Sequence, residues 1–341
     1  MPSSRSRIEK LEAVRGLAAL YVVVAHGWGE RFWFMKFGQE AVMVFFLLSG
    51  FVIEFTFARD PHLSFGTYFK KRWVRIYPPL LLLFGLVMIL GHSETQKPDF
   101  LTDLIGNLLM LQDFDLGKPH VLVPTLYAPA LWSLHYEWWF YMLFFPFRRY
   151  LAQTQATRVV ISLSLLSALA YLFFPYAAPR LLMYFLSWWI GVIMAQSYQR
   201  HGRVIAKELF PALAGMVGIC ALLGVKVAWA AQSGQNLLFG LHPILELRHF
   251  TAALFATLGA LLWQRIKWIG FSPIMVGQWF APISYTLYIA HQPLWAYAEY
   301  GQEISPSWAQ SGLRLTVLIL FCYLTELKLY PWLRQKFISR N

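Results

Sequence analysis

The sequence predicts an all-α protein, a polytopic integral membrane helix bundle of about ten transmembrane helices with both termini in the cytoplasm. Of the 341 residues, 58% are hydrophobic and only 13% are charged, whereas soluble domains carry roughly 25% charged residues. Ten apolar segments are long enough, or nearly so, to cross a bilayer. Basic residues gather in short connections between these segments, as is typical of cytoplasmic loops.

The apolar segments follow one another along most of the chain. They cover roughly 11–28, 41–58, 76–92, 132–147, 159–174, 181–198, 209–225, 244–264, 282–299 and 312–330. Segment 132–147 is short for a span and needs neighbouring residues at its ends. The first segment follows a basic stretch, as in a secretory signal, but Glu12 and Arg15 interrupt its apolar region. We therefore expect an uncleaved first helix.

A cytoplasmic N-terminus places every strongly basic connection on the same side of the membrane. The residues concerned are Arg5, Arg7, Lys10, Lys70, Lys71, Arg72, Arg75, Arg148, Arg149, Arg158, Arg200, Arg203, Lys207, Arg265, Lys267, Arg334, Lys336 and Arg340. This is the distribution that the Lys/Arg bias of membrane proteins requires. Topology thus explains the net charge of +12, and we expect the lipid bilayer, not a nucleic acid, as the partner of this charge.

Residues 93–131 are the ambiguous part of this topology. The stretch TDLIGNLLMLQ within them has the composition of a further span. Counting it as one would move most later basic loops to the opposite side, so we expect 93–131 to be a non-cytoplasmic segment, which can be re-entrant. Irregular backbone at membrane depth needs protein or water around it, so this segment can line an acceptor entrance. We expect residues 1–341 to form a single membrane domain.

Arg15 and His26 stand inside the first apolar segment, where each charge costs about 2.5–3.5 kcal/mol to insert. Their spacing puts both side chains on one stripe of a helix, ~16 Å apart along its axis. That distance is about half of a bilayer's hydrocarbon thickness. The alternative interpretation is that Arg15 is a snorkelling anchor paired with Glu12, and that His26 is an ordinary interfacial histidine.

Two later segments carry polar stripes at helical spacing. The stripes are Ser133, Glu137 and Tyr141 at i, i+4 and i+8, and Ser284, Tyr288 and His291 at i, i+4 and i+7. Interhelical hydrogen bonds of about 0.6 kcal/mol each would explain the serines and tyrosines. They explain the histidine and the glutamate less well, so we predict that these stripes face a site.

The sequence KKRWVRIYPPLLL, at the start of the third segment, puts Arg72 and Arg75 on one helix face with Lys71 beside them. Basic residues before a span are the commonest topology signal, and they also contact anionic lipid headgroups. The functional alternative is a phosphate clamp, because guanidinium groups bind phosphate oxygens through two parallel hydrogen bonds. These residues alone leave both interpretations open.

Five motifs in this order resemble the membrane-bound acyltransferase-3 family, which includes O-acetyltransferases of bacterial surface polysaccharides. They are LEAVRGLAALYVVVAH, VFFLLSGFVI, the R-x-x-R of RWVR, LWSLHYEWWFY and SYTLYIAHQP. The resemblance runs from Lys10 to Pro331 and implies a multi-pass protein of the bacterial inner membrane. It also implies an acyl-CoA donor, expected to be acetyl-CoA, and an active site that includes Arg15 and His26. Glu12 departs from the family pattern, which usually has an aspartate there.

This resemblance predicts transfer of an acyl group, expected to be acetyl, from cytosolic acyl-CoA to a hydroxyl of a glycan or glycolipid at the outer side of the membrane. In this hypothesis His26 is the general base, and Glu137 orients its imidazole. Arg15 guides the pantetheine arm of the donor. The donor phosphates would be held by Arg72, Arg75 and Lys71, and the substrate by Ser133, Tyr141, Ser284, Tyr288 and His291. We expect no metal.

Two other functions stay open at this point. One is an acyltransferase for a small-molecule acceptor, which differs only in the acceptor site. The other is a proton-coupled transporter, which also uses His and Glu at membrane depth, although the two halves of this sequence show no symmetry. The sequence does not identify the acceptor, the acyl chain length, the use of an acyl-enzyme intermediate, a partner protein or the oligomeric state.

Overall fold

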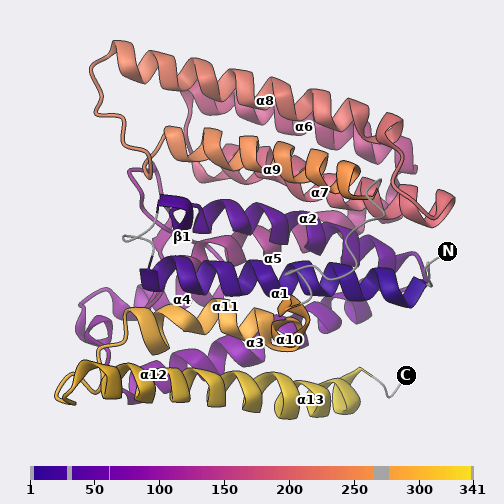
Figure 1. Ribbon diagram of the computed structural model, residues 1–341. Helices are drawn as coiled ribbons and strands as arrows, with labels where there is room; N and C mark the ends of the chain where they lie inside the picture. The colour runs from indigo at the N-terminus through magenta and orange to yellow at the C-terminus, as the bar shows by residue number, and fades with distance from the viewer. Residues whose placement is uncertain (1–3, 29–32, 61, 265–275, 339–341) are drawn as a thin grey trace.

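The computed structural model of the protein describes residues 4–28, 33–60, 62–264 and 276–338 (Figure 1). The side chains of residues 4–9, 28 and 34 are outside this description. Of the basic residues that predict the topology, Arg265, Lys267 and Arg340 therefore lie outside the described residues, as do the side chains of Arg5 and Arg7.

The described chain is mostly helical. Its longer helices are α1 (Ser4–Trp28), α2 (Gly38–Phe57), α3 (Phe65–Ile89), α5 (Trp132–Tyr150), α6 (Gln153–Phe173), α7 (Ala177–His201), α8 (Ala206–Gln232), α9 (Ile244–Trp263) and α12 (Ser307–Cys322). Shorter helices are α4 (Phe100–Leu108), α10 (Gly277–Phe280), α11 (Ser284–His291) and α13 (Tyr330–Phe337). Single turns of 3-10 or π helix are η1 (Trp33–Met35), η2 (Ser93–Gln96), η3 (Pro129–Leu131), η5 (Ala281–Ile283), η6 (Gln292–Ala296) and η7 (Tyr323–Leu329).

Six helices among the described residues, α2, α3, α6, α7, α8 and α9, are long and apolar enough to cross a membrane by length and composition. The other predicted spans are helical as well. They correspond to α1, to α5, to α11 with its π-helical continuation η6, and to α12 continued by η7 and α13. These helices run alongside the six in one bundle (Figure 1). The all-α, multi-pass architecture predicted from the sequence is thus supported.

Predicted cytoplasmic residues meet at one end of the bundle. Arg148 at the end of α5 forms an ion pair with Glu54 near the end of α2, with the nitrogen and oxygen 3.1 Å apart. Lys70 at the start of α3 lies over the ring of Phe337 at the end of α13, 5.8 Å from its centroid. The beginning of α1 and the end of α13 lie at the same end of the bundle (Figure 1).

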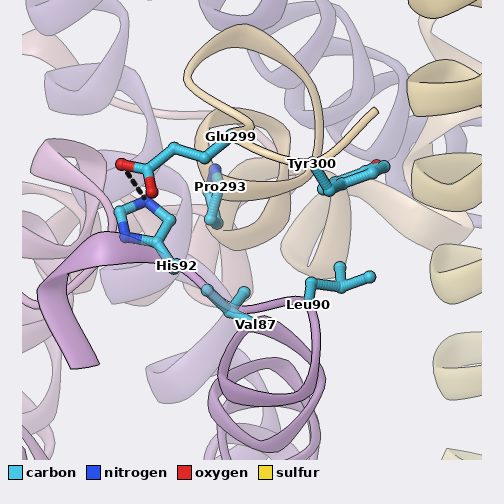
Figure 2. Close-up of a pocket in the computed structure, with 6 residues that line it drawn as sticks. All are labelled: Val87, Leu90, His92, Pro293, Glu299 and Tyr300. Carbon is cyan, nitrogen blue, oxygen red and sulfur yellow. Dashed lines mark ion pairs between the residues drawn. The ribbon is translucent and has the colours of Figure 1, made fainter. Parts of the chain in front are cut away.

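The loops at the opposite end also contact one another. Ser93 donates a hydrogen bond from its hydroxyl to Glu299, at 2.7 Å. Figure 2 shows the same junction, where His92 Nε2 lies 3.7 Å from a carboxylate oxygen of Glu299 and Pro293 packs beside the pair. The backbone N–H of His242, before α9, donates to the carbonyl of Leu116, at 2.8 Å. These contacts tie three loops into one cap over this end of the helices.

Segment 93–131 belongs to this cap and contains only short elements. Helix α4 has nine residues and is too short to cross a bilayer. Strands β1 (Gln112–Asp113) and β2 (Val123–Pro124) pair in parallel over two residues each. The Asn107 side chain joins α4 to this ladder by donating to the carbonyl of Pro124, at 2.8 Å.

Two helix crossings are closed by glycines. A Cβ added at Gly50 of α2 would overlap the carbonyl oxygen of Trp188 in α7, and one added at Gly191 would overlap α2 in turn. Gly16 of α1 and Gly277 of α10 face each other's helices in the same way. Small residues let helix backbones approach this closely in membranes. These crossings therefore fix α2 against α7 and α1 against α10.

Candidate active site

A cavity of about 150 Å³ lies beside the C-terminal end of α1, with room for on the order of ten water molecules. Residues from several elements line it, including His26, Gln39, Phe114, Trp132, Tyr288 and Gln292. Three of the lining residues, Phe114, Pro129 and Ala130, come from segment 93–131. The wall thus combines aromatic rings with a few polar groups, as is typical of ligand sites.

His26, on this wall, forms a hydrogen-bonded pair with the fully buried His291. His291 Nδ1 lies 2.7 Å from the carbonyl oxygen of Tyr288, and His26 Nδ1 lies 2.8 Å from that of Val22. Carbonyl oxygens only accept hydrogen bonds, so both Nδ1 atoms carry a proton. His291 Nε2 lies 3.2 Å from His26 Nδ1 and accepts from the same N–H. This arrangement leaves a lone pair on His26 Nε2, the nitrogen of a general base.

A hydroxyl chain supports the same wall. Ser133 and Tyr288 have their hydroxyl oxygens 2.9 Å apart, and the Tyr288 hydroxyl donates to the carbonyl of Ala130, at 2.8 Å. Since the Tyr288 proton is used in this way, Ser133 is the donor in the first bond. Two predicted stripes, one on α5 and one on α11, therefore meet beside the cavity.

Buried charges anchor the part of segment 93–131 that reaches the cavity. Asp113, next to Phe114, pairs with Lys118 at 2.8 Å and with Arg180 of α7 at 3.2 Å, and accepts from the Tyr136 hydroxyl at 2.9 Å. Burial raises the pKa of Asp113, but Lys118 and Arg180 outweigh burial and hold this pKa below its ordinary value. The charged form is therefore the stable one in the fold.

Two buried side chains contact the Trp132 ring in the cavity wall. His249 of α9 stacks on it with an interplanar angle of 5° and a centroid distance of 5.3 Å. The Lys118 ammonium lies 4.8 Å from its centroid. The same lysine thus contacts Asp113 and Trp132, and couples the buried ion pair to the wall of the cavity.

At the other end of the α1 stripe, Arg15 donates to the carbonyl of Ala281, at 3.1 Å. The Ser284 hydroxyl donates to the same carbonyl, at 2.9 Å. Ser284 therefore lies beside Arg15 and not at the cavity. The Arg15 Nε atom is buried, and it has no hydrogen-bond partner within the described parts of the chain.

Glu137 does not orient His26, and this prediction is wrong. Its carboxylate accepts hydrogen bonds from the hydroxyls of Ser49, at 2.7 Å, and of Tyr141. Trp188 completes the cluster by donating to Ser49, at 3.2 Å. The partner of the His26 imidazole is His291 instead. Glu137 lies one helical turn along α5 from Ser133, so its side chain reaches a different level of the bundle.

The two predicted clamp arginines have different surroundings. Arg75 forms an ion pair with Glu326 of η7, whose side chain is 1% exposed, and lies between the rings of Tyr285 and Tyr330. Arg72 lies over the ring of Tyr141, with 5.7 Å to its centroid. Its Nε is buried, and no described residue accepts a hydrogen bond from it. Lys71, the third predicted clamp residue, is half-buried.

The structure therefore divides the predicted site residues between two places. His26, His291, Ser133 and Tyr288 gather at the cavity. The remaining residues, Arg15, Arg72, Arg75, Glu137, Tyr141 and Ser284, lie toward the other end of the stripe. Two further polar residues were not predicted, Ser49 beside Glu137 and Gln292 on the cavity wall, although both stand inside the motifs VFFLLSGFVI and SYTLYIAHQP.

The structure thus combines a bundle of apolar helices with a histidine on the wall of a cavity. The model of the acyltransferase-3 family, described as an acyltransferase domain, matches residues 8–327. The chain belongs to this family.

The chain is also similar to individual curated proteins. It is 33% identical to the acyltransferase MdmB of Streptomyces mycarofaciens over 159 residues, which cover 42% of this chain and 40% of that protein. It is 27% identical to an O-acetyl transferase of Shigella phage Sf6 over 146 residues, or 39% of this chain and 43% of that protein. The chain thus spans less than half the length of these relatives. No solved structure matches it.

Proposed function

We propose that the protein is a membrane O-acyltransferase. It moves an acyl group, in the simplest case acetyl, from acyl-CoA in the cytoplasm to a hydroxyl of a glycan or glycolipid at the outer side of the membrane. The observation that carries this proposal is His26 on the cavity wall, paired with the buried His291, in a chain of the acyltransferase-3 family.

His26 Nε2 takes the proton of the acceptor hydroxyl as its oxygen attacks the thioester carbonyl. A C–O bond forms, the C–S bond breaks, and the same proton passes from Nε2 to the departing sulfur of coenzyme A. His291 holds the His26 ring in the tautomer that leaves Nε2 free, through the 3.2 Å contact to Nδ1. In this role His291 replaces Glu137, the residue that the sequence suggested.

The donor lies along α1. Arg15 and His26 are ~16 Å apart along the helix axis, so a pantetheine arm extended past Arg15 brings the thioester to His26. Arg72 and Lys71 bind the nucleotide phosphates, and the unpartnered Arg72 Nε supports this assignment. Arg75 is already neutralised by Glu326, and in this proposal it contributes to the donor site mainly by fixing α3 against η7.

We further propose ten spans with both termini in the cytoplasm, and with the cavity toward the outer side of a bacterial inner membrane. The basic residues gathered near the start of α3 and the end of α5 support this orientation. A cysteine at Arg149 should be shielded from a membrane-impermeant thiol reagent in intact cells, whereas a cysteine at Asp115 should react. Reaction at position 149 would overturn the proposed sidedness.

The most direct test is mass spectrometry of surface glycans from cells that produce the wild-type chain, the His26→Ala variant or neither. We expect acyl esters on the glycan only with the wild-type chain. An unchanged glycan, together with acyl-CoA turnover by the purified protein on a soluble acceptor, would identify a small-molecule acyltransferase instead. An absence of any acyl-CoA turnover would favour a transporter.

A further inference from the structure

Gln292 is a fully buried side chain on the cavity wall, directly after His291. Its Oε1 accepts a hydrogen bond from the backbone N–H of Ala130, at 2.6 Å. A backbone N–H only donates, so this bond settles which end of the amide is oxygen and which is nitrogen. The other end, Nε2, is buried and has no hydrogen-bond partner among the residues that the structure describes.

The local backbone holds Gln292 in this position. Pro293 has no N–H and so removes one α-helical hydrogen bond just after the histidine. The chain continues as the π-helical turn η6, which the N–H of Tyr297 closes onto the carbonyl of Gln292, at 2.7 Å. Ala130 is held as well, because its carbonyl accepts from Tyr288. The amide of Gln292 is thus fixed at both its backbone and its Oε1.

A fixed, buried and unpartnered N–H group costs free energy unless a ligand completes it. Acyl transfer creates such a ligand, because attack on the thioester turns the carbonyl oxygen into an oxyanion. Amide N–H groups are typical oxyanion donors, and donors that are fixed before the reaction need no reorganisation during it. Gln292 and His26 line the same cavity, where that oxyanion would form.

We propose that Gln292 is a catalytic residue, the oxyanion donor of the transfer reaction; this inference rests on the proposed function. The acceptor oxygen bonds to the carbonyl carbon, its proton moves to His26 Nε2, and the carbonyl electron pair moves onto the oxygen. The Gln292 Nε2–H group donates a hydrogen bond to that oxygen. Collapse of the intermediate restores the carbonyl, breaks the C–S bond and returns the proton from His26 to the sulfur.

The test uses acetyl-CoA hydrolysis by the full chain in lipid nanodiscs, with water as the acceptor. Water passes through the same oxyanion but makes no use of contacts to a glycan. Gln292→Glu keeps the Oε1 acceptor for Ala130 and removes the donor, whereas Gln292→Met removes both without adding charge. We expect both variants to lower kcat for hydrolysis by about 10²–10³-fold, with KM for acetyl-CoA unchanged.

Gln196→Met is the matched control. It replaces another buried glutamine, on α7 and outside the cavity wall, and should hydrolyse acetyl-CoA like the wild type. If Gln292→Met also melts earlier, the Glu variant, which keeps the Ala130 bond, decides the outcome. Hydrolysis within about threefold of wild type in the Glu variant would overturn the proposal, as would a loss seen only in transfer to glycan. A wild-type protein without any acetyl-CoA turnover would instead refute the proposed function.

Discussion

The two ends of the α1 stripe differ in how their polar groups are satisfied. At the arginine end, which comprises Arg15, Arg72, Arg75, Glu137 and Glu326, guanidinium groups meet carboxylates and aromatic rings. At the histidine end, which comprises His26, His291 and the cavity, the groups are imidazoles, hydroxyls and an amide. Fixed charge suits the binding of a charged ligand, whereas groups that can gain or lose a proton suit chemistry. In the proposed function, α1 therefore separates donor binding from the reaction by ~16 Å.

The largest expected effect is at the histidine end. His26→Ala and His26→Gln should each lower acyl transfer by about 10²–10⁴-fold, because neither variant can take up a proton. The wild-type rate should fall toward low pH, where a protonated imidazole cannot act as a base. Transfer assays across pH and thermal melting of the purified variants measure both effects. Near-normal turnover by His26→Gln would show that His26 is not the general base, and that the histidine end is not distinguished by proton transfer.

The next effect concerns the loop that carries Phe114 into the cavity. Asp113→Asn leaves Lys118 and Arg180 buried without a counter-charge, which should destabilise the fold by about 3–5 kcal/mol at neutral pH. Because the folded-state pKa of Asp113 is depressed, its stabilisation is complete above the unfolded pKa and is lost as pH falls through the folded pKa. The melting temperature of the variant should therefore fall less than that of the wild type as the pH is lowered. Thermal melting at several pH values measures this difference.

Asp115→Asn is the control for this prediction. Asp115 is exposed in the same loop and accepts from the N–H of Gly117, at 3.0 Å, a bond that asparagine keeps. We expect a change of about 0.5 kcal/mol or less. Equal effects at positions 113 and 115 would show that the buried ion pair makes no particular contribution to the free energy of unfolding.

Within the arginine end, substitutions of the two clamp arginines should differ in their effect on acyl-CoA affinity. Arg72→Lys removes the planar fork from a residue whose Nε has no hydrogen-bond partner among the described residues, and should weaken acyl-CoA binding by about 1.5–3 kcal/mol. Arg75→Lys keeps a positive charge against Glu326 and should change that affinity less. Equilibrium binding of acetyl-CoA measures the difference. The reverse order of effects would assign the phosphates to Arg75.

The smallest expected effect is at His291. His291→Phe keeps an aromatic ring but removes the acceptor for His26 Nδ1–H. Loss of one hydrogen bond of about 1.4 kcal/mol corresponds to roughly tenfold in rate. We expect a fall in kcat without a change in KM for acyl-CoA, measured by steady-state transfer. An equal rise in KM would place His291 in donor binding and not in positioning.

Periodicity predicted the fold and the helix faces, but not the neighbours of each face. All ten apolar segments contain helix, and the stripe on α5 is polar along its length. However, Ser133 and Glu137 are one turn apart on α5, and their side chains contact different helices: Ser133 contacts α11 and Glu137 contacts α2. His26 and His291 are 265 positions apart, so their contact depends on how the helices pack. Local sequence does not contain that information.

Gln292 and Ser49 were missed for a related reason. Each is a single uncharged polar residue in an apolar motif, and one such residue makes no periodic signal. The proposal for Gln292 rests on its place in the cavity wall and on a nitrogen without a described partner, while the neighbouring oxygen is bonded. That property belongs to the packed structure and cannot be predicted from the sequence.

The glycine crossings also restrict how this chain can evolve. Gly50, Gly191, Gly16 and Gly277 each face backbone of another helix, and backbone cannot shrink to make room for a methyl group. A larger residue at any of them would need a whole helix to shift, so no compensating side-chain substitution is available nearby. Side chains that line the cavity can change one at a time, whereas these four positions fix the helix frame that holds them.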